Sequence, residues 1–517
     1  MKRQARVLAY NTTISVVAMV VEGALAFYVV RFLLASLGDT AYGVWTTVAG
    51  AFAYAGLLQI GLSSSVNWLV PGCLARNDQG GLDSIVSTAL AYYVLVGAVV
   101  LVVTLSVSWW FPLWFNVPEE FARTSIALCL IVGSSLAIRM PLNVFPAALS
   151  GFQEYVPQSV AWMLISVLRL ALVVLFVSKV AASVGTALLA IAFIHVGADI
   201  VNQGFNALLT FRRVPGMRLG FSRFQMPLFK TMVAYGFNTM LYVLSVMILV
   251  SGTYVMISIL LGPDQVAWYV IPITLVTVMQ QIVFSMVGAI KPAAASLHAL
   301  GEMDRIRVIF LRSQKYSVIV LVPMTWFLIV MSGPLIGLWI EDPAKMAMAP
   351  VAALLAVAYF FYLAQQSAAF VLIGLGKHRI FGLLTACSVA ACLVLDIIFV
   401  KVCGWGLWGI AIGTAIPMMV AAVIVLPTYT CRVLKLSRRR TLKEAWLKPM
   451  IIAVPVGLLT VALYYGLYPS TWPRLLAEMA LIGGAAMLLN WWISLEPEER
   501  KFFLGLLRLD RFARKRA

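Results

Sequence analysis

The chain has 517 residues, of which 62% are hydrophobic and 11% are charged, and its formal net charge is +18. This composition excludes a water-soluble globular protein and favours a protein whose solvent is lipid. Backbone amides need internal partners in hydrocarbon, and the apolar runs reach the roughly twenty residues that a helix needs to cross a bilayer. The sequence therefore predicts an all-α, polytopic membrane protein.

Glycines, prolines and charge clusters divide the chain into about fourteen predicted membrane-spanning helices. The predicted spans are 9–36, 43–70, 84–108, 122–146, 157–178, 186–210, 233–261, 266–290, 316–340, 347–374, 380–402, 406–430, 449–468 and 474–494. Most of the 38 Lys and Arg residues fall in the loops on one side of these spans. The positive-inside rule then predicts that both termini are cytoplasmic. Because the basic residues are dispersed over many short loops, we expect membrane lipids rather than nucleic acid as their partners.

The first six predicted spans recur, in weaker form, as the next six. AYNT at Ala9–Thr12 returns as AYGFNT at Ala234–Thr239, and LGDTAYGVW at Leu37–Trp45 returns as LGPDQVAWY at Leu261–Tyr269. Six is an even number, so both copies enter the membrane from the same side and the repeat is parallel. This pattern predicts two pseudo-symmetric six-helix lobes around a central cavity.

The repeat also sets the predicted domain boundaries. Residues 1–215 form the N-terminal lobe and residues 216–445 the C-terminal lobe, while 446–495 form an extra helix pair without a counterpart in the repeat. Residues 496–517 form a basic tail, which we expect to be cytoplasmic.

Four segments resemble one known group of transporters. They are LGDTAYGVW, LLQIGLSSSVNWLV at Leu57–Val70, GLGKHR at Gly374–Arg379 and GWGLWGIAIGT at Gly404–Thr414. On these segments, and over nearly its whole length, the chain resembles the polysaccharide-transporter branch of the multidrug/oligosaccharidyl-lipid/polysaccharide (MOP) exporter superfamily.

The resemblance implies a flippase of the bacterial inner membrane that works by alternating access. Its substrates would be undecaprenyl-pyrophosphate-linked oligosaccharide repeat units, moved from the cytoplasmic to the periplasmic leaflet for O-antigen or exopolysaccharide assembly. The polysaccharide polymerase machinery would be a partner, and the protein is expected to be a monomer. A multidrug/cation antiporter and a lipid II flippase of the same superfamily stay open as alternatives.

Polar side chains repeat at helical spacing in several spans, as expected of helices that line an aqueous cavity. The side chains expected to line this cavity are Asn11, Gln59, Asn67, Asn202, Asn238 and Gln281. The alternative is that such groups only form hydrogen bonds between neighbouring helices.

Cations within the predicted spans are the candidate substrate-binding residues, because each costs about 2.5 to 3.5 kcal/mol at the bilayer centre without a partner. Arg169 lies near mid-depth, where its guanidinium could bind phosphate oxygens in bidentate fashion. Arg139 lies lower in the fourth span. Arg31 and Lys291 lie near span ends, where snorkelling and ordinary positive-inside anchoring are the competing explanations.

Glu22, Asp199 and His195 are the candidates for coupling transport to a proton or sodium gradient, since His195 lies one helical turn from Asp199. The alternative is that the two carboxylates pair with arginines within the lobe. For Asp396, near the outer end of the eleventh span, we expect a solvated position at the interface. Glu478 is assigned no role.

Nothing in the sequence indicates an enzyme. Gly404–Gly409 matches G-x-G-x-x-G but opens a membrane helix with no strand before it, so a nucleotide site is not expected. The six cysteines lack C-x-x-C spacing and the three histidines form no metal-ligand pattern. A membrane-embedded glycosyl-transferring enzyme is the least favoured class, because no sizeable polar loop is present. We expect no metal and no cofactor.

Overall fold

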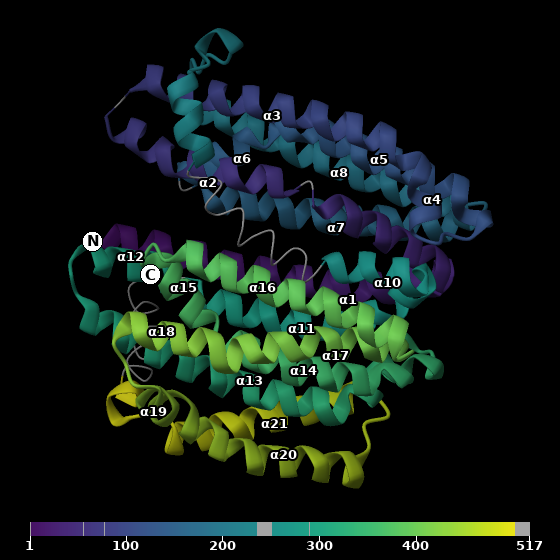
Figure 1. Cartoon of the computed structure of the whole chain (residues 1–517), viewed down its shortest axis with the longest axis vertical. Coiled ribbons are helices and arrows are strands. Elements are labelled where there is room, and N and C mark those ends of the chain that lie inside the picture. The colour runs from purple at the N-terminus through teal and green to yellow at the C-terminus, as the bar shows by residue number, and fades with distance from the viewer. Residues whose placement is uncertain are drawn as a thin grey trace, which may run out of the picture. The chain divides into compact units, whose positions relative to one another are not determined.

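The computed structural model describes residues 2–54, 56–76, 78–152, 154–234, 251–288 and 290–501, with the backbone alone for residues 2–20, 57–61, 64, 68, 75, 155, 299 and 378–381. Over this part of the chain the structure is helical and contains no strand (Figure 1). The predicted all-α fold class is therefore confirmed.

Twelve helices among the described residues are long and apolar enough to cross a membrane. Each of them coincides with one of the fourteen predicted spans, so the predicted number is approximate. The two predicted spans without a single matching helix are 43–70 and 233–261. The first is divided between the end of α1 and α2, and the second includes residues 235–250, which lie outside the described residues.

The chain divides into two compact units. Unit 1 comprises Met1–Ile271 and His378–Pro417, and unit 2 comprises Pro272–Lys377 and Met418–Ala517. The lobe boundaries proposed from the internal repeat stay a prediction.

Unit 1 contains a bundle in which α5 packs against α3 and α8, and α7 packs against α1 and α8 (Figure 1). Its elements are α1 (Lys2–Ala53), α2 (Gly56–Ala75), α3 (Gln79–Val107), η1 (Ser108–Trp110), α4 (Phe111–Trp114), α5 (Glu119–Leu142), α6 (Val144–Gly151), α7 (Tyr155–Lys179), α8 (Val184–Arg213), η2 (Phe221–Arg223), α10 (Thr253–Leu261), the start of α11 (Pro263–Val287), α16 (His378–Ile397), η5 (Ile398–Val402) and most of α17 (Gly406–Val420). A Cβ atom on Gly97 of α3 would lie 2.6 Å from the Ala137 carbonyl oxygen of α5. Glycine therefore permits the close approach of these two helices.

Gly38 divides α1 into two helical segments. Its φ of 78° and ψ of 173° are not helical, and a positive φ favours glycine because it has no Cβ atom. The change of direction at Gly38 separates the first predicted span from the start of the second.

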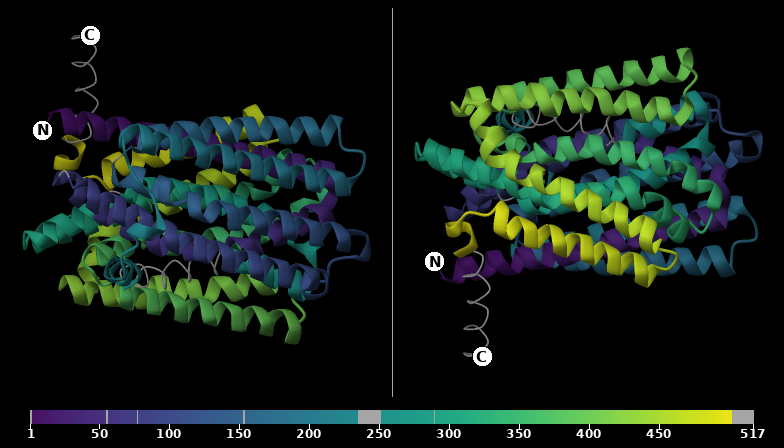
Figure 2. Two further views of the ribbon diagram at one scale, coloured as in Figure 1. Left: turned by 90° about the horizontal axis from the view of Figure 1, so that it is seen from above. Right: turned by 90° about the horizontal axis from the view of Figure 1, so that it is seen from below.

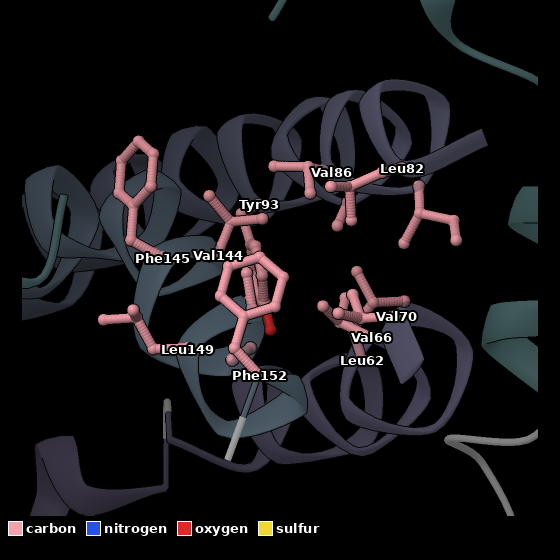
Figure 3. Close-up of a cluster of buried hydrophobic side chains, with 14 of the residues drawn as sticks. Leu62, Val66, Val70, Leu82, Val86, Tyr93, Val144, Phe145, Leu149 and Phe152 are labelled. Atoms are coloured by element: carbon pink, nitrogen blue, oxygen red, sulfur yellow. The ribbon is translucent and has the colours of Figure 1, made fainter. Parts of the chain in front are cut away.

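A buried apolar cluster joins α2, α3 and α6 (Figure 3). Val66 of α2, Val86 of α3 and Val144 of α6 are fully buried in it. Tyr93 of α3 is also buried there, and its hydroxyl lies 2.8 Å from the Ser63 hydroxyl of α2. The apolar faces of these helices thus pack together, with the one phenol satisfied by a neighbouring hydroxyl.

Unit 2 is built around α13, which packs against α14, α20 and α21. Its elements are the rest of α11, α12 (Ile290–Ala299), α13 (Met303–Ile340), η4 (Pro343–Met348), α14 (Ala349–Ala364), α15 (Gln366–Gly374), η6 (Ala421–Val425), α18 (Leu426–Leu434), α19 (Arg438–Thr441), η7 (Leu442–Leu447), α20 (Lys448–Leu467) and α21 (Trp472–Ile493). The last two helices lie side by side (Figures 1 and 2). Gly457 of α20 leaves room for the Trp326 ring of α13, whose nearest atom would lie 2.6 Å from an added Cβ.

Just after α21, an ion pair and a hydrogen bond hold the end of the described chain to α13. We call their three residues, Glu499, Lys315 and Tyr316, the ionic clasp. Glu499 is 2% exposed; its Oε2 lies 2.6 Å from Lys315 Nζ, and its Oε1 accepts a hydrogen bond of 2.9 Å from Tyr316 Oη. Burial alone raises the pKa of Glu499, but hydrogen bonds from Lys315, the Glu496 amide and Tyr316 bring it below its ordinary value of 4.5. The first residues of the predicted tail are therefore anchored to unit 2.

Candidate functional site

Charged side chains from four helices of unit 1 form a cluster inside the bundle. Arg139 lies on α5, Arg169 on α7, Asp199 on α8 and Glu22 on α1, and all four are partly buried. We call these four residues, together with His195 of α8, the charge cluster. The helix contacts that build it are α1 with α7, α5 with α8, and α7 with α8.

The cluster extends along the bundle rather than lying at one depth. α7 ends, and α5 and α8 begin, at the same end of the bundle. At a rise of about 1.5 Å per residue, Arg169 lies about 15 Å from that end, His195 about 17 Å, Asp199 about 22 Å and Arg139 about 30 Å. The arginines thus stand at two levels, with Asp199 between them.

Arg139 and Asp199 form an ion pair between Arg139 Nη1 and Asp199 Oδ2. The two side chains are 28% and 20% exposed, so the pair is only partly screened by solvent. The sequence analysis gave two alternatives for Asp199, ion coupling or pairing with an arginine. The structure shows that Asp199 has an arginine partner.

Arg169 is held differently. Its guanidinium carbon lies 5.5 Å from the centroid of the Trp162 ring, a cation–π contact within α7. Asp199 and Glu22 are within electrostatic reach. Among the residues that the structure describes, however, none forms an ion pair or a hydrogen bond with the Arg169 side chain. Its five N–H donors are therefore available to a ligand.

His195 packs against Trp45, which lies in α1 beyond Gly38. The two ring centroids are 5.1 Å apart in an edge-to-face arrangement. Arg169 is near enough for its charge to act on the imidazole. His195 thus lies at about the level of Arg169, one helical turn from Asp199 along α8.

A second polar contact lies one turn further along α8. Gln203 Nε2 donates a 2.8 Å hydrogen bond to Asn143 Oδ1, and both residues are buried. Asn206 is buried beside them, whereas Asn202 is partly exposed. Asn143 was missed from the sequence, although its place four residues after Arg139 puts it on the same helical face and could have revealed it.

Arg31 and Lys291 are the other two candidate substrate-binding residues. Arg31 is partly buried in α1, about 10 Å from the bend at Gly38 on a rise of about 1.5 Å per residue. Lys291 is exposed at the start of α12, in unit 2. These positions are compatible with the anchoring explanations given above.

Besides Asn202, the structure describes the side chains of two predicted cavity-lining residues. Asn67 is exposed on α2, and Gln281 is partly buried on α11 in unit 2. The side chains of Asn11, Gln59 and Asn238 lie outside the described residues.

The expectation for Asp396 is wrong. We expected a solvated interfacial carboxylate, but Asp396 is only 2% exposed, and its Oδ1 has no hydrogen-bond partner among the described residues. The carboxyl group lies against Gly413, because the missing side chain there lets α17 pack closely on α16. Glu478 in α21 is likewise buried, at 4% exposed.

No group of three or more His, Cys, Asp and Glu side chains in the described part of the chain could hold a metal ion.

No protein-family model matches the chain, and no curated protein matches it by sequence. Solved structures do match. An inward-facing multidrug resistance MATE family transporter of the MOP superfamily aligns with a TM-score of 0.68 at 16% identity, over 80% of this chain and 94% of that one. The outward-facing conformation of such a transporter aligns with a TM-score of 0.58 at 17% identity, over 81% and 95%.

A third match is a MOP superfamily transporter from Pyrococcus furiosus, for which a binding pocket of reverse polarity is said to suggest a different function. It aligns with a TM-score of 0.58 at 18% identity, over 81% of this chain and 95% of that one. At these identities the likeness concerns the fold. The chain has the polytopic helical fold of the MATE transporters of the MOP superfamily.

Proposed function

We propose that this protein is an alternating-access transporter that flips undecaprenyl-pyrophosphate-linked oligosaccharides across the bacterial inner membrane, for O-antigen or exopolysaccharide assembly. The proposal rests on the fold and on one observation in particular. Arg169 stands well inside α7 with its N–H donors unused by any described residue. A guanidinium so placed is suited to a phosphate, which it can bind through two parallel hydrogen bonds.

The second arginine supports the same substrate class. Arg139 lies about 15 Å further along the bundle, at a rise of about 1.5 Å per residue, and is neutralised by Asp199. An anionic headgroup that passes from one level to the other would leave one arginine and bind the other. Asp199 would neutralise Arg139 while the headgroup is not bound there. Such an arrangement lowers the cost of moving a phosphate through the bundle, because a cation is present at both levels.

A multidrug/cation antiporter is the second candidate, since the matched MATE structures are named for multidrug resistance. The partly buried carboxylates of Glu22 and Asp199 are the groups that would bind a cationic drug or a coupling ion. A lipid II flippase remains a third candidate, because its substrate also carries a pyrophosphate.

Complementation tests the flippase proposal. Cells that lack their own flippase would receive the wild-type gene, Arg169→Ala, Arg169→Lys or Arg123→Ala, the last being an exposed arginine at the start of α5. We expect Arg169→Ala to lower surface polysaccharide roughly tenfold or more, on about 1.5 to 3 kcal/mol for a charge-assisted hydrogen bond. Lysine should be intermediate because it cannot bind phosphate through a planar fork. Arg123→Ala should match the wild type.

Other outcomes discriminate among the candidates. Full activity of a normally inserted Arg169→Ala protein would contradict the cationic site. Failure to restore polysaccharide, together with raised tolerance to cationic drugs that Glu22→Gln or Asp199→Asn abolishes, would favour the antiporter. Rescue of cells depleted of their lipid II flippase would favour the third candidate.

A further inference from the structure

Unit 2 contains a small apolar pocket of its own. It is formed where α14, η6, α18, α19 and η7 meet. The lining residues that matter here are Phe361, Val423, Pro427, Arg438, Leu442 and Trp446. Apart from Arg438, these side chains are apolar, so the pocket suits a hydrocarbon group.

Two π-helical segments form walls of this pocket. η6 contributes Val423, and η7 contributes Leu442 and Trp446. A π turn is wider than an α turn and is found frequently at functional sites. The indole of Trp446 stacks on the Phe361 ring, with centroids 6.1 Å apart and planes 16° apart. One rigid aromatic face of the pocket is thereby fixed.

The pocket lies at the ends of two membrane spans. The candidate spans Gly406–Leu434 and Arg438–Leu467 meet there, joined by a short basic connection. Val423, Leu442 and Leu447 are 42%, 55% and 52% exposed, which is expected of side chains that face lipid rather than water. A lipid acyl chain therefore has direct access to the pocket.

Arg438 supplies a charge beside the apolar lining. Its Nη2 donates a 3.1 Å hydrogen bond to the Val423 carbonyl, which fixes the guanidinium at the pocket. In the described chain no carboxylate pairs with Arg438, whereas its neighbour Arg440 is paired with Glu444 at 2.7 Å. The remaining N–H groups of Arg438 can therefore bind an anion.

We propose that this pocket binds an anionic phospholipid, with one acyl chain against Trp446 and the headgroup phosphate on Arg438. The site combines an apolar cavity, a fixed guanidinium and a location where phospholipid headgroups and chains meet. The surrounding segment, Arg432 to Lys448, carries seven Lys and Arg residues, which favour an anionic over a zwitterionic lipid. This site goes beyond the proposed transport function and does not depend on it.

Fluorescence quenching tests the proposal, because a bromine atom on an acyl chain quenches a tryptophan that it touches. The purified full-length protein would be placed in phosphatidylcholine vesicles in which the same minor fraction of lipid is dibrominated, as either phosphatidylglycerol or phosphatidylcholine. The chain has 15 tryptophans, so the Trp446 signal is taken as the difference between the wild type and Trp446→Phe. We expect brominated phosphatidylglycerol to quench this signal severalfold more than brominated phosphatidylcholine.

Two arginine variants separate a specific site from general surface charge. Arg438→Gln should remove the preference for phosphatidylglycerol, whereas Arg439→Gln, which removes the same charge next to the pocket lining, should keep it. Val423→Phe should fill the pocket and lower quenching by both lipids. Native mass spectrometry of the wild type and the two arginine variants gives a readout that does not depend on Trp446→Phe.

Three results would overturn the proposal. One is equal quenching of the Trp446 signal by the two brominated lipids in the wild-type protein. Another is an equal loss of preference in Arg438→Gln and Arg439→Gln. The third is the absence of retained phosphatidylglycerol on the wild type in the mass spectrum.

Discussion

Asp199 lies between two arginines at different levels of the bundle in unit 1. Its ion pair with Arg139 joins α5 to α8, and it also lies within electrostatic reach of Arg169. Removal of one member of such a pair leaves the other charge without compensation in a medium of low dielectric constant. The carboxylate therefore contributes to stability and, in the proposed transport cycle, competes with an anionic substrate.

A double-mutant cycle measures the strength of this ion pair. Arg139→Ala alone should destabilise the protein by about 1 to 3 kcal/mol, less than for a fully buried pair because both side chains are partly exposed. The double variant Arg139→Ala/Asp199→Ala should lose less than the sum of the two single variants. Thermal unfolding in detergent gives the three differences, and strictly additive losses would contradict the pairing.

The sequence predicted the members of the charge cluster better than their contacts. Helical spacing placed His195 and Asp199 on one face, and charge within a span singled out Arg139 and Arg169. Spacing cannot show which neighbouring helix faces that side, so the Arg139–Asp199 pair was only one of two alternatives. Asp396 was misjudged because its burial depends on Gly413, a residue that carries no chemical signal of its own.

Among the helices, α16 and α17 are in close contact at Gly413. A Cβ atom on Gly413 would collide with the Asp396 carboxyl group and lie 2.8 Å from its backbone nitrogen. Any side chain at this position must push the two helices apart, and overpacking of this kind typically costs about 1 to 3 kcal/mol.

Glycine-to-alanine substitutions at two helical positions test this contact. Gly413→Ala should lower the free energy of unfolding by about 1 to 3 kcal/mol. Gly483→Ala in α21, where an added Cβ meets nothing within 4 Å, should leave it unchanged or slightly raised. The comparison is made by thermal or denaturant unfolding, and equal effects at the two positions would refute the steric explanation.

The clasp on α13 gives a pH-dependent contribution to stability. The pKa of Glu499 is lower in the folded protein than its ordinary value of 4.5. The contribution of Glu499 to the free energy of unfolding is therefore fully present above pH 4.5, and it is lost as the pH falls through the folded-state pKa. Glu499→Gln should cost about 3 kcal/mol at neutral pH, since Lys315 is left buried without its partner.

Glu498→Gln is the matched control, because the Glu498 side chain is 85% exposed and its ion pair with Arg312 is long, with 3.7 Å between Oε2 and Nη2. It should change stability little. The measurement is the melting temperature of each variant from neutral pH down to below 4.5. A Glu499→Gln deficit that persisted undiminished at the lowest pH would count against the ionic clasp.

The spans were predicted well wherever a helix is continuous and apolar. The second predicted span was the exception within the described residues, because it is divided between the end of α1 and α2. The sequence VAGAFAYAGLL, residues 48–58, is apolar on both sides of that division. Hydropathy therefore could not reveal an interruption that comes from backbone geometry.

At the scale of the whole molecule, the charge asymmetry of the loops predicts one orientation in the membrane. Cys403 is exposed in the turn between η5 and α17, on the side opposite to the basic loops. A membrane-impermeant maleimide applied to spheroplasts should label it. Cys403→Ser should remove that labelling, whereas Cys73→Ser, at the opposite end of the bundle, should not. Labelling of Cys403 only after the membrane is opened would reverse the predicted topology.

The parallel repeat was predicted from short matches that lie mostly at the ends of spans. These matches predict an order of helices in which the second set of six repeats the first. They carry little information about the substrate, because loop and turn residues fix topology rather than the polarity of the bundle interior. The substrate assignment therefore depends on Arg169 and Arg139, which the repeat does not identify.

The π segments around the lipid pocket imply a simple evolutionary history. A π turn accommodates about one residue more than an α turn, so each of η6 and η7 is what a single inserted residue leaves in an α-helix. Deletion of one residue from Ala421–Val425 would restore α geometry and rotate the following residues by about 100°. A descendant could thus gain or lose the pocket through one in-frame insertion or deletion, without any substitution in the rest of its lining.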